Sequence, residues 1–328
     1  MADPAPLLVT GAAGFIGARF VESCAARGVG VVSVDRASHF AERTEHAGVA
    51  FGRIVDRDVL FEWLAADAPH FAGIVHLGAC TDTTELDVAY LERVNVDYSK
   101  RLWRFASERQ VPFVYASSAA TYGDGTGGYD DDETRIGALR PLNPYGESKQ
   151  RFDRFALDEE RRGASPPAWS GFKFFNVYGF GERHKGRMAS VVLHAFDQIR
   201  ATDRMRLFRS HREGIADGEQ KRDFIAVEDV VDALHFALAR PLARGIYNLG
   251  TGRARCFLDL AHATFAALGR TPGIDFVDTP PELRARYQYF TEARMHKLRA
   301  AGWSRHATPL EEGVARYVAR LLAASQPG

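Results

Sequence analysis

Cysteine is scarce in this sequence. Cys24, Cys80 and Cys256 are the only three cysteines among 328 residues, and they are widely spaced. No Cys-x-x-Cys pair occurs, so we expect neither a disulfide framework nor a metal site built on cysteines. Single, separated cysteines are typical of proteins in a reducing compartment, and we therefore expect a cytoplasmic protein without a bound metal.

The sequence also lacks an excess of charge and a long apolar run. Lys plus Arg and Asp plus Glu both total 42, which gives a formal net charge of zero. A binder of nucleic acid or of an anionic membrane would carry a basic excess. No stretch approaches the ~18 apolar residues of a membrane span, and the first six residues show no basic segment leading into an apolar one. We therefore expect small-molecule partners, with no nucleic acid and no membrane.

Short apolar runs alternate with helix-length segments in the first half of the chain. The predicted strands are 7–10, 31–35, 73–77, 112–116 and 170–175, followed by a late one at 245–249. This alternation predicts an α/β fold with a Rossmann-type, doubly wound parallel sheet. After about residue 178 the rhythm weakens, so we expect a dinucleotide-binding domain over 1–177 with returns near 222–252, and a smaller, interleaved C-terminal lobe mainly over 178–328.

A glycine-rich turn lies between the first predicted strand and the first helix. Gly11, Gly14 and Gly17, with Phe15 and Ile16 between them, allow backbone N–H groups to approach a pyrophosphate at the helix N-terminus. Asp35 ends the second strand, where an acidic side chain binds a ribose 2′-hydroxyl. This combination predicts a nicotinamide dinucleotide site.

Arg36 follows Asp35 directly and leaves the choice of cofactor open. Its guanidinium can pair with a 2′-phosphate, as NADP requires, or be a solvated surface charge. The residues themselves are compatible with NADP and with NAD.

Tyr145 and Lys149 lie four residues apart at the start of a predicted helix, after Pro144. This spacing places them on one helical face, where an ammonium group favours the phenolate that a base needs. Ser118 follows the apolar strand 112–116 and can donate a hydrogen bond to a reacting oxygen. These residues predict a catalytic Ser, Tyr and Lys set.

Several segments make the chain resemble the extended short-chain dehydrogenases/reductases and, within them, the ADP-L-glycero-D-manno-heptose 6-epimerase family. The glycine turn and Tyr-x-x-x-Lys are common to the superfamily, whereas HKGRMAS at 184–190 and RYQ at 286–288 are specific to the family. Further matching segments are 78–85, 115–123, 141–146, 174–179, 221–224, 250–254 and 298–302. Nearly the whole chain is covered.

The resemblance implies an epimerase. A hydride leaves C6″ of ADP-D-glycero-D-manno-heptose for a tightly bound NADP, giving a 6″-ketone, and returns to the opposite face. Because C6″ is exocyclic, rotation about C5″–C6″ moves the carbonyl oxygen away from the first acid/base. A second acid/base is therefore useful. Tyr145 fits one of the two roles, and Lys185 matches the position of the family's second acid/base.

The resemblance also implies binding residues and an assembly. The implied cofactor-binding positions are Leu77, Gly78, Ala79, Cys80, Thr81, Asn95, Val177 and Lys185, in addition to the glycine turn, Asp35, Arg36, Tyr145 and Lys149. The implied substrate-binding positions are Asn176, Arg187, His194, Phe208, Arg209, Ser210, His211, Arg222 and Tyr287. A homo-oligomer is expected, with a pentamer known in the family.

Departures from the family pattern concern the ligands rather than the reaction type. The stretch 37–43 lacks a lysine that the family can place against a cofactor phosphate, so NADP preference would depend on Arg36 or Arg43. Arg187 stands where we expect a small polar residue, and Arg209, Ser210 and His211 stand where we expect an acidic, glycine-containing stretch.

Three other functions share parts of this pattern. A nucleotide-sugar 4,6-dehydratase needs an Asp-Glu pair after the active-site hydroxyl, where this chain has Ala119 and Ala120. A UDP-hexose 4-epimerase uses the same Ser, Tyr and Lys and needs no second base, so it is the alternative enzyme. A non-enzymatic dinucleotide sensor commonly loses the Tyr or Lys, which this chain keeps.

Overall fold

A seven-stranded parallel sheet forms the centre of the molecule. The computed structural model describes residues 5–67, 69–240, 242–284 and 287–325. The strand order is β11-β6-β5-β4-β1-β2-β3. The bounds are β1 Leu7–Thr10, β2 Val31–Asp35, β3 Arg53–Asp56, β4 Gly73–His76, β5 Phe113–Ser118, β6 Trp169–Phe174 and β11 Gly245–Leu249. All neighbouring pairs are parallel, which confirms the predicted Rossmann-type fold.

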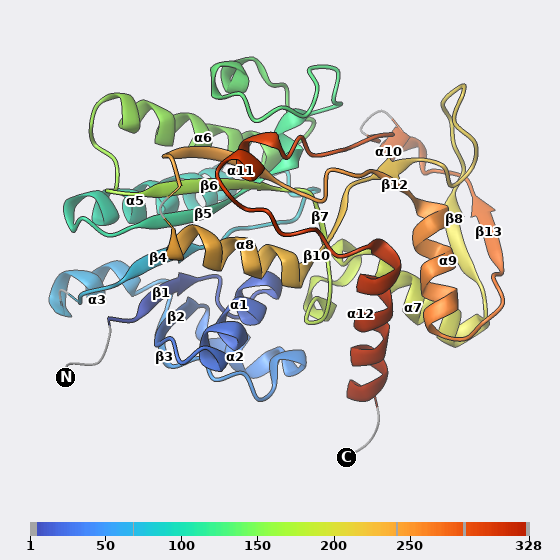
Figure 1. The fold of residues 1–328 in the computed structure, drawn as a ribbon, viewed down its shortest axis with the longest axis horizontal. Helices are drawn as coiled ribbons and strands as arrows, with labels where there is room; N and C mark the ends of the chain where they lie inside the picture. The colour runs from blue at the N-terminus through green and yellow to red at the C-terminus, as the bar shows by residue number, and fades with distance from the viewer. Residues whose placement is uncertain (1–4, 68, 241, 285–286, 326–328) are drawn as a thin grey trace.

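Helices cover both faces of this sheet (Figure 1). One face packs against α1 (Phe15–Ala26), α8 (Val227–Ala239) and α11 (His296–Ala300), with Phe20, Leu234 and Leu298 among the buried residues. The opposite face packs against α3 (Leu60–Asp67), α5 (Tyr98–Glu108) and α6 (Pro144–Arg161), around the fully buried Trp103. Because both faces are covered, the central strands are apolar on both sides, as the predicted strand pattern requires.

The order in which strands are added to the sheet reverses at β1: β2 and β3 lie on one side of it, and β4 and the later strands lie on the other. Connections on the two sides of β1 run to opposite faces, so a crevice opens at the carboxyl ends of β1 and β4. In folds of this kind ligands bind at such a crevice. This geometry fixes where the candidate site lies.

The second half of the chain builds its own apolar core beside the sheet. It contains α7 (Val191–Thr202), α9 (Phe257–Ala267) and α12 (Leu310–Ala324), with Phe196, Phe265 and Tyr317 buried between them. Three small sheets complete it: β7 (Asn176–Tyr178) with β10 (Phe224–Ala226), β8 (Met205–Phe208) with β13 (Ile274–Val277), and β9 (Lys221–Arg222) with β12 (Arg255–Cys256). The return of β11 to the main sheet shows that the lobe is interleaved, as expected.

Short elements connect these parts. They are α2 (Ala37–Glu42), α4 (Val88–Leu91), α10 (Pro281–Arg284), the π-helical turn Glu92–Asp97, and the 3-10 turns Thr44–His46, Ala119–Tyr122, Glu133–Ala138 and Arg183–Met188. Within the described residues, no helix is both long and apolar enough to cross a membrane.

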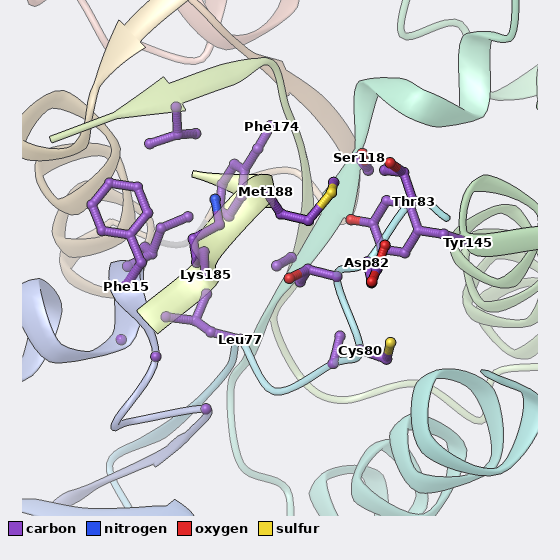
Figure 2. A pocket seen from close by; sticks show the side chains of 18 of the residues that line it. Phe15, Leu77, Cys80, Asp82, Thr83, Ser118, Tyr145, Phe174, Lys185 and Met188 are labelled. Carbon is purple, nitrogen blue, oxygen red and sulfur yellow. The ribbon is translucent and has the colours of Figure 1, made fainter. Parts of the chain in front are cut away.

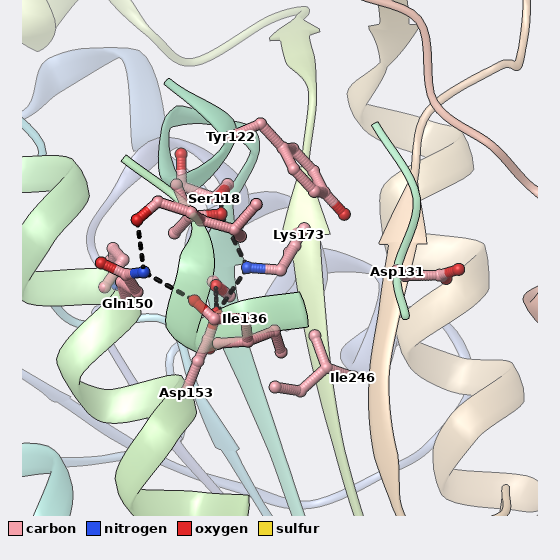
Figure 3. Close-up of polar contacts among 12 residues, drawn as sticks. Ser118, Tyr122, Asp131, Ile136, Gln150, Asp153, Lys173 and Ile246 are labelled. Carbon is pink, nitrogen blue, oxygen red and sulfur yellow. Dashed lines mark hydrogen bonds and ion pairs between the residues drawn. The ribbon is translucent and has the colours of Figure 1, made fainter. Parts of the chain in front are cut away.

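A buried ion pair joins α6 to the strands beneath it (Figure 3). Lys173 Nζ on β6 lies 2.6 Å from Asp153 Oδ2 on α6, and both side chains are fully buried. Asp153 also accepts hydrogen bonds from the Tyr115 hydroxyl at 3.0 Å and the Ser117 hydroxyl at 2.8 Å, both on β5. Lys173 donates a second hydrogen bond to Thr121 Oγ1 at 2.7 Å. The pair therefore fixes α6 relative to β5, β6 and the turn after β5.

We expect Lys173→Met to lower the free energy of unfolding by about 3–5 kcal/mol, because Asp153 is then buried without its counter-ion. Urea denaturation followed by circular dichroism measures this change. The double variant Lys173→Met/Asp153→Asn removes both charges and should recover much of the loss. The exposed pair Arg53–Asp67 is the control: Arg53→Met should cost less than about 1 kcal/mol. An equal loss of unfolding free energy in Lys173→Met and Arg53→Met would contradict the idea that burial makes the Asp153–Lys173 pair costly to break.

Candidate active site

A cleft of about 910 Å³ lies at the carboxyl ends of the central strands. It is lined by the turns after β1, β2, β4 and β5, by the start of α6, and by the segment that carries Lys185 (Figure 2). The structure thus brings the predicted glycine turn, Ser118, Tyr145, Lys149 and Lys185 into one cavity.

The glycine turn is packed too tightly for side chains. Gly11 has a positive φ of 68°, and a Cβ there would lie 2.6 Å from the backbone nitrogen of Gly78. A Cβ on Gly17 would lie 2.0 Å from the carbonyl oxygen of Gly11. The turn after β1 and the turn after β4 therefore approach each other directly, at the N-terminus of α1. This cradle fits the pyrophosphate of a dinucleotide.

Asp35 lies at the carboxyl end of β2 and lines the cleft. It is 8% exposed at the end of β2, and its Oδ2 accepts a hydrogen bond from the backbone N–H of Ala13 at 3.1 Å. Its Oδ1 accepts one from the backbone N–H of Arg36 at 2.8 Å and lies 2.8 Å from Nδ1 of His39. Arg43 donates to the carbonyl oxygen of Ala13 at 2.7 Å. Three basic side chains, those of Arg36, His39 and Arg43, therefore line the cleft around this carboxylate.

Tyr145 and Lys149 share one face of α6, as the spacing predicts. Asn143 caps the start of the helix, and its side chain accepts a hydrogen bond from the N–H of Gly146 at 2.8 Å. Lys149 Nζ donates to the carbonyl oxygen of Ala116 at 2.9 Å. Burial lowers the pKa of Lys149 to about 8, while the charge of Asp153 opposes this shift. The Asp153 carboxylate therefore favours the charged form of Lys149 against the effect of burial.

Ser118 lies at the end of β5 beside the phenol of Tyr145 (Figure 2). Its hydroxyl oxygen accepts a hydrogen bond from the N–H of Ala120 at 3.1 Å. Burial raises the pKa of Tyr145, and interaction with the Ser118 hydroxyl opposes that shift. The phenol therefore needs a nearby positive charge before it can act as a base near neutral pH.

Lys185 reaches the same cleft from a different segment. It belongs to the 3-10 turn Arg183–Met188, and its Nζ lies 5.4 Å from the centroid of the Phe15 ring. Figure 2 shows Lys185 beside Phe15 and Leu77, whereas Tyr145 lies with Ser118 and Thr83 at the other end of the cleft. Burial lowers the pKa of Lys185, and Glu182 opposes that shift. A lysine in this setting can exchange a proton more readily than an exposed one.

Most of the predicted cofactor positions line the cleft, and one does not. Leu77, Gly78, Ala79, Cys80, Thr81 and Val177 are among the lining residues. Asn95 lies behind them, 1% exposed. Its amide pairs with the backbone of Cys80, at 2.8 and 3.0 Å, and donates to Ser148 Oγ at 3.0 Å. Asn95 therefore ties the turn after β4 to the helix that carries Tyr145.

Some of the predicted substrate positions gather in an aromatic cluster beside the cleft. The Arg222 guanidinium lies 5.4 Å from the Tyr287 ring and 5.6 Å from the Phe257 ring, and Phe257 lines the cleft. The rings of Phe208 and Tyr287 are 6.4 Å apart. A guanidinium flanked by aromatic rings is suited to a nucleotide diphosphate.

The remaining predicted positions are dispersed. Asn176 lines the cleft, whereas His194, in the first turn of α7, is not among the lining residues, although Val191 and Val192 at the start of that helix are. Arg187 is 71% exposed and pairs with Asp82 at 3.0 Å, which joins the turn of Lys185 to the loop after β4.

The segment Arg209, Ser210 and His211 folds back onto its own loop. Asp217 pairs with the Arg209 side chain at 3.0 Å and with the N–H of Ser210 at 2.8 Å, and His211 N–H donates to the Tyr289 hydroxyl at 3.1 Å. Arg286 of the family-specific RYQ block lies outside the described residues.

Sequence reasoning missed Asp153, Lys173 and Glu182. Asp153 lies eight residues after Tyr145 and so continues the same helical face, which was a usable signal. Lys173 is a charged residue in the middle of an apolar strand, which also signals a buried partner. Glu182 carries no signal of burial, because the contact with Tyr317 that helps to bury it lies 135 residues away.

Comparison with known proteins identifies the class. The model of the NAD dependent epimerase/dehydratase family matches residues 7–250. The chain belongs to this family. The glycine cradle and Asp35 agree with the dinucleotide that the family uses, so the cofactor is a nicotinamide dinucleotide, NAD or NADP.

Two relatives that are similar in sequence share one name. The chain is 42% identical to the ADP-L-glycero-D-manno-heptose-6-epimerase of Fusobacterium nucleatum, over 97% of this chain and 98% of that protein. It is 44% identical to the enzyme of the same name from Nitratidesulfovibrio vulgaris, over 98% of this chain and 99% of that one.

Solved structures agree in fold. The Helicobacter pylori ADP-L-glycero-D-manno-heptose-6-epimerase superposes with a TM-score of 0.81 at 25% identity, covering 98% of this chain and 97% of that one. The Thermus thermophilus UDP-glucose 4-epimerase, in complex with NAD, superposes with a TM-score of 0.77 at 26% identity, covering 97% and 99%.

We expect Gly17→Ala to weaken cofactor binding at least tenfold, or about 1.4 kcal/mol. The new Cβ would push the first turn of α1 away from Gly11 and open the cradle. The ratio of dinucleotide to protein after purification measures this loss. Gly127→Ala is the matched control, because a Cβ there meets no atom within 4 Å. Full cofactor occupancy in Gly17→Ala would contradict the assigned role of the turn.

Proposed function

We propose that this protein converts ADP-D-glycero-D-manno-heptose to ADP-L-glycero-D-manno-heptose by epimerisation at C6″. The observation that supports the proposal is that two titratable side chains line one cleft, Tyr145 from α6 and Lys185 from the turn 183–188. The names of the relatives supply the substrate. Two separated groups suit an exocyclic carbon, because rotation about C5″–C6″ carries the oxygen from one group to the other.

The proposed roles follow from position. Tyr145 accepts the proton of one C6″ hydroxyl configuration, Ser118 donates a hydrogen bond to the same oxygen, and the Lys149 ammonium favours the phenolate. Lys185 exchanges the proton of the other configuration. The bound dinucleotide supplies the acceptor and donor of the hydride. Because the 6″-ketone must stay in place until it is reduced, a deep cleft is an advantage.

We propose that the ADP part lies against the aromatic cluster of the lobe 178–328, while residues 1–177 hold the dinucleotide. Arg222 has no acidic partner in the described part of the chain. It is 7% exposed and donates hydrogen bonds to backbone carbonyls of Lys221 and Gln288. A buried cation without a counter-ion is suited to receive a diphosphate.

For the cofactor we propose NADP, tightly bound, with Arg36 on the 2′-phosphate. Arg36 is exposed and lines the cleft next to Asp35. Arg36→Ala should weaken NADP binding about tenfold or more and leave NAD binding nearly unchanged. Fluorescence titration of protein freed of cofactor measures both affinities. An equal loss for NAD and NADP would contradict a phosphate contact.

We further propose a cytoplasmic homo-oligomer, a pentamer by resemblance to the family. Leu86, just before α4, and Val88, its first residue, are 66% and 46% exposed, which leaves apolar surface for a neighbouring copy to cover. Light scattering coupled to size-exclusion chromatography measures the assembly. A monomer at micromolar concentration would contradict it.

Proton NMR of the purified protein with ADP-D-glycero-D-manno-heptose tests the function. We expect the L-glycero epimer to form without added cofactor. Tyr145→Phe and Lys185→Met should each slow turnover at least about a hundredfold while the dinucleotide stays bound.

Lys100→Met is the matched control, because in the described part of the chain Lys100 on α5 forms ion pairs with two surface acids, Glu92 at 3.7 Å and Asp97 at 3.6 Å. If the heptose is unchanged but a UDP-hexose is epimerised at C4″, the alternative enzyme replaces this proposal.

A further inference from the structure

Glu182 is a buried carboxylate beside the candidate second acid/base. Its side chain is 0% exposed, at the start of the turn that carries Lys185. Within the described residues, its one ion-pair partner is Lys185, with Nζ 3.9 Å from Oε2. A buried carboxylate is costly unless hydrogen bonds and a counter-charge compensate it, so this placement needs an explanation.

Three hydrogen bonds hold the carboxylate in one orientation. Oε2 accepts the backbone N–H of Ser190 at 2.7 Å, and Oε1 accepts the Ser190 hydroxyl at 2.5 Å. Oε1 also accepts the hydroxyl of Tyr317 at 3.1 Å, and Tyr317 lies on α12. The C-terminal helix therefore helps to fix an acidic group at the edge of the cleft.

Few other charges face Lys185. His184 precedes it in the turn, and its Nδ1 lies 2.8 Å from Glu45, which also accepts the backbone N–H of His184 at 2.8 Å. Arg43 adds a positive charge near His184. Phe15 supplies an aromatic face on the cleft side. Glu182 is the acid whose charge acts directly on the Lys185 ammonium.

We propose that Glu182 is a positioning residue for Lys185: its anchored carboxylate holds the ammonium group at the cleft edge and keeps it protonated in the resting enzyme. The inference deepens the proposed function and rests on the role of Lys185 in it. Lys185 then presents a proton for the ketone oxygen on one side of the cleft, while Tyr145 serves the other side. The α12 helix, through Tyr317, becomes part of the support of the active site.

The pKa of Lys185 gives the sign of the expected effect. Burial lowers this pKa and the charge of Glu182 opposes the shift. Removing that charge should lower the pKa further, so that Lys185 loses its proton at a lower pH. An opposite charge at this distance shifts a pKa by about one unit or more.

Glu182→Gln is a suitable test because the amide can keep the anchoring bonds. The amide oxygen can accept the Ser190 N–H, and the amide NH₂ can donate to the two hydroxyl groups, which accept as well as donate. The variant therefore removes the charge without leaving the Ser190 N–H unpaired.

Trace acetylation of the cofactor-loaded protein measures the protonation of Lys185 directly. Only the neutral amine reacts, so the pH at which acetylation of the Lys185 peptide is half-maximal, read by mass spectrometry, reports its pKa. We expect this midpoint to fall by about one unit in Glu182→Gln. We also expect kcat to fall at least about tenfold at neutral pH, with its alkaline limb moved to lower pH and KM nearly unchanged.

Glu45→Gln is the matched control, because it removes a nearby acid that bonds to His184 rather than to Lys185. Its Lys185 midpoint should stay at the wild-type value. An unchanged midpoint in Glu182→Gln, or a lowered midpoint with unchanged kcat, overturns the inference. Failure of the proposed function is separate: it would appear as unchanged heptose with the wild-type protein, whatever the midpoint in Glu182→Gln. Normal turnover in Lys185→Met would remove only the role of Lys185.

Discussion

The buried pair Asp153–Lys173 is the constraint on which the candidate active site depends. Tyr145 and Lys149 lie on the helix that Asp153 anchors, and Ser118 ends the strand whose Tyr115 and Ser117 bind the same carboxylate. Such a pair contributes little net stability compared with an apolar core, but breaking it is costly. The ion pair therefore fixes the position of α6 relative to β5. The proposed catalytic side chains, which these two elements carry, are fixed with them.

Different contacts fix the part of the cleft that contains Lys185. Lys185 lies on a short 3-10 turn that belongs to no sheet. Its position therefore depends on side-chain contacts. Glu182, bonded to Ser190 and Tyr317, provides the fixed charge there. Each proton-transfer group in the proposed mechanism is thus supported by a buried carboxylate, Asp153 for Tyr145 and Glu182 for Lys185. Lys185 also lies close to the glycine turn, because its ammonium group is near the ring of Phe15, the residue after Gly14.

The sequence was sufficient where the signal is local. The strands at 7–10, 31–35 and 245–249 match β1, β2 and β11, because buried parallel strands are continuous apolar runs. β3 was missed, since Arg53 and Asp56 leave only two consecutive apolar residues in it. The spacing of Tyr145 and Lys149 is also local. The contacts of Glu182 with Tyr317, 135 residues away, have no such signal, because the fold brings them together. The predicted roles of Arg187 and His194 depended on resemblance alone.

In the proposed reaction C6″ is inverted by oxidation and reduction within one cleft, rather than by removal of a proton from carbon. Turnover of ADP-D-glycero-D-manno-heptose in deuterium oxide tests this most directly, with the product analysed by NMR and mass spectrometry. We expect the epimer to carry no deuterium at C6″, because the hydrogen leaves and returns as a hydride that does not exchange with solvent. Deuterium at C6″ of the product would contradict it.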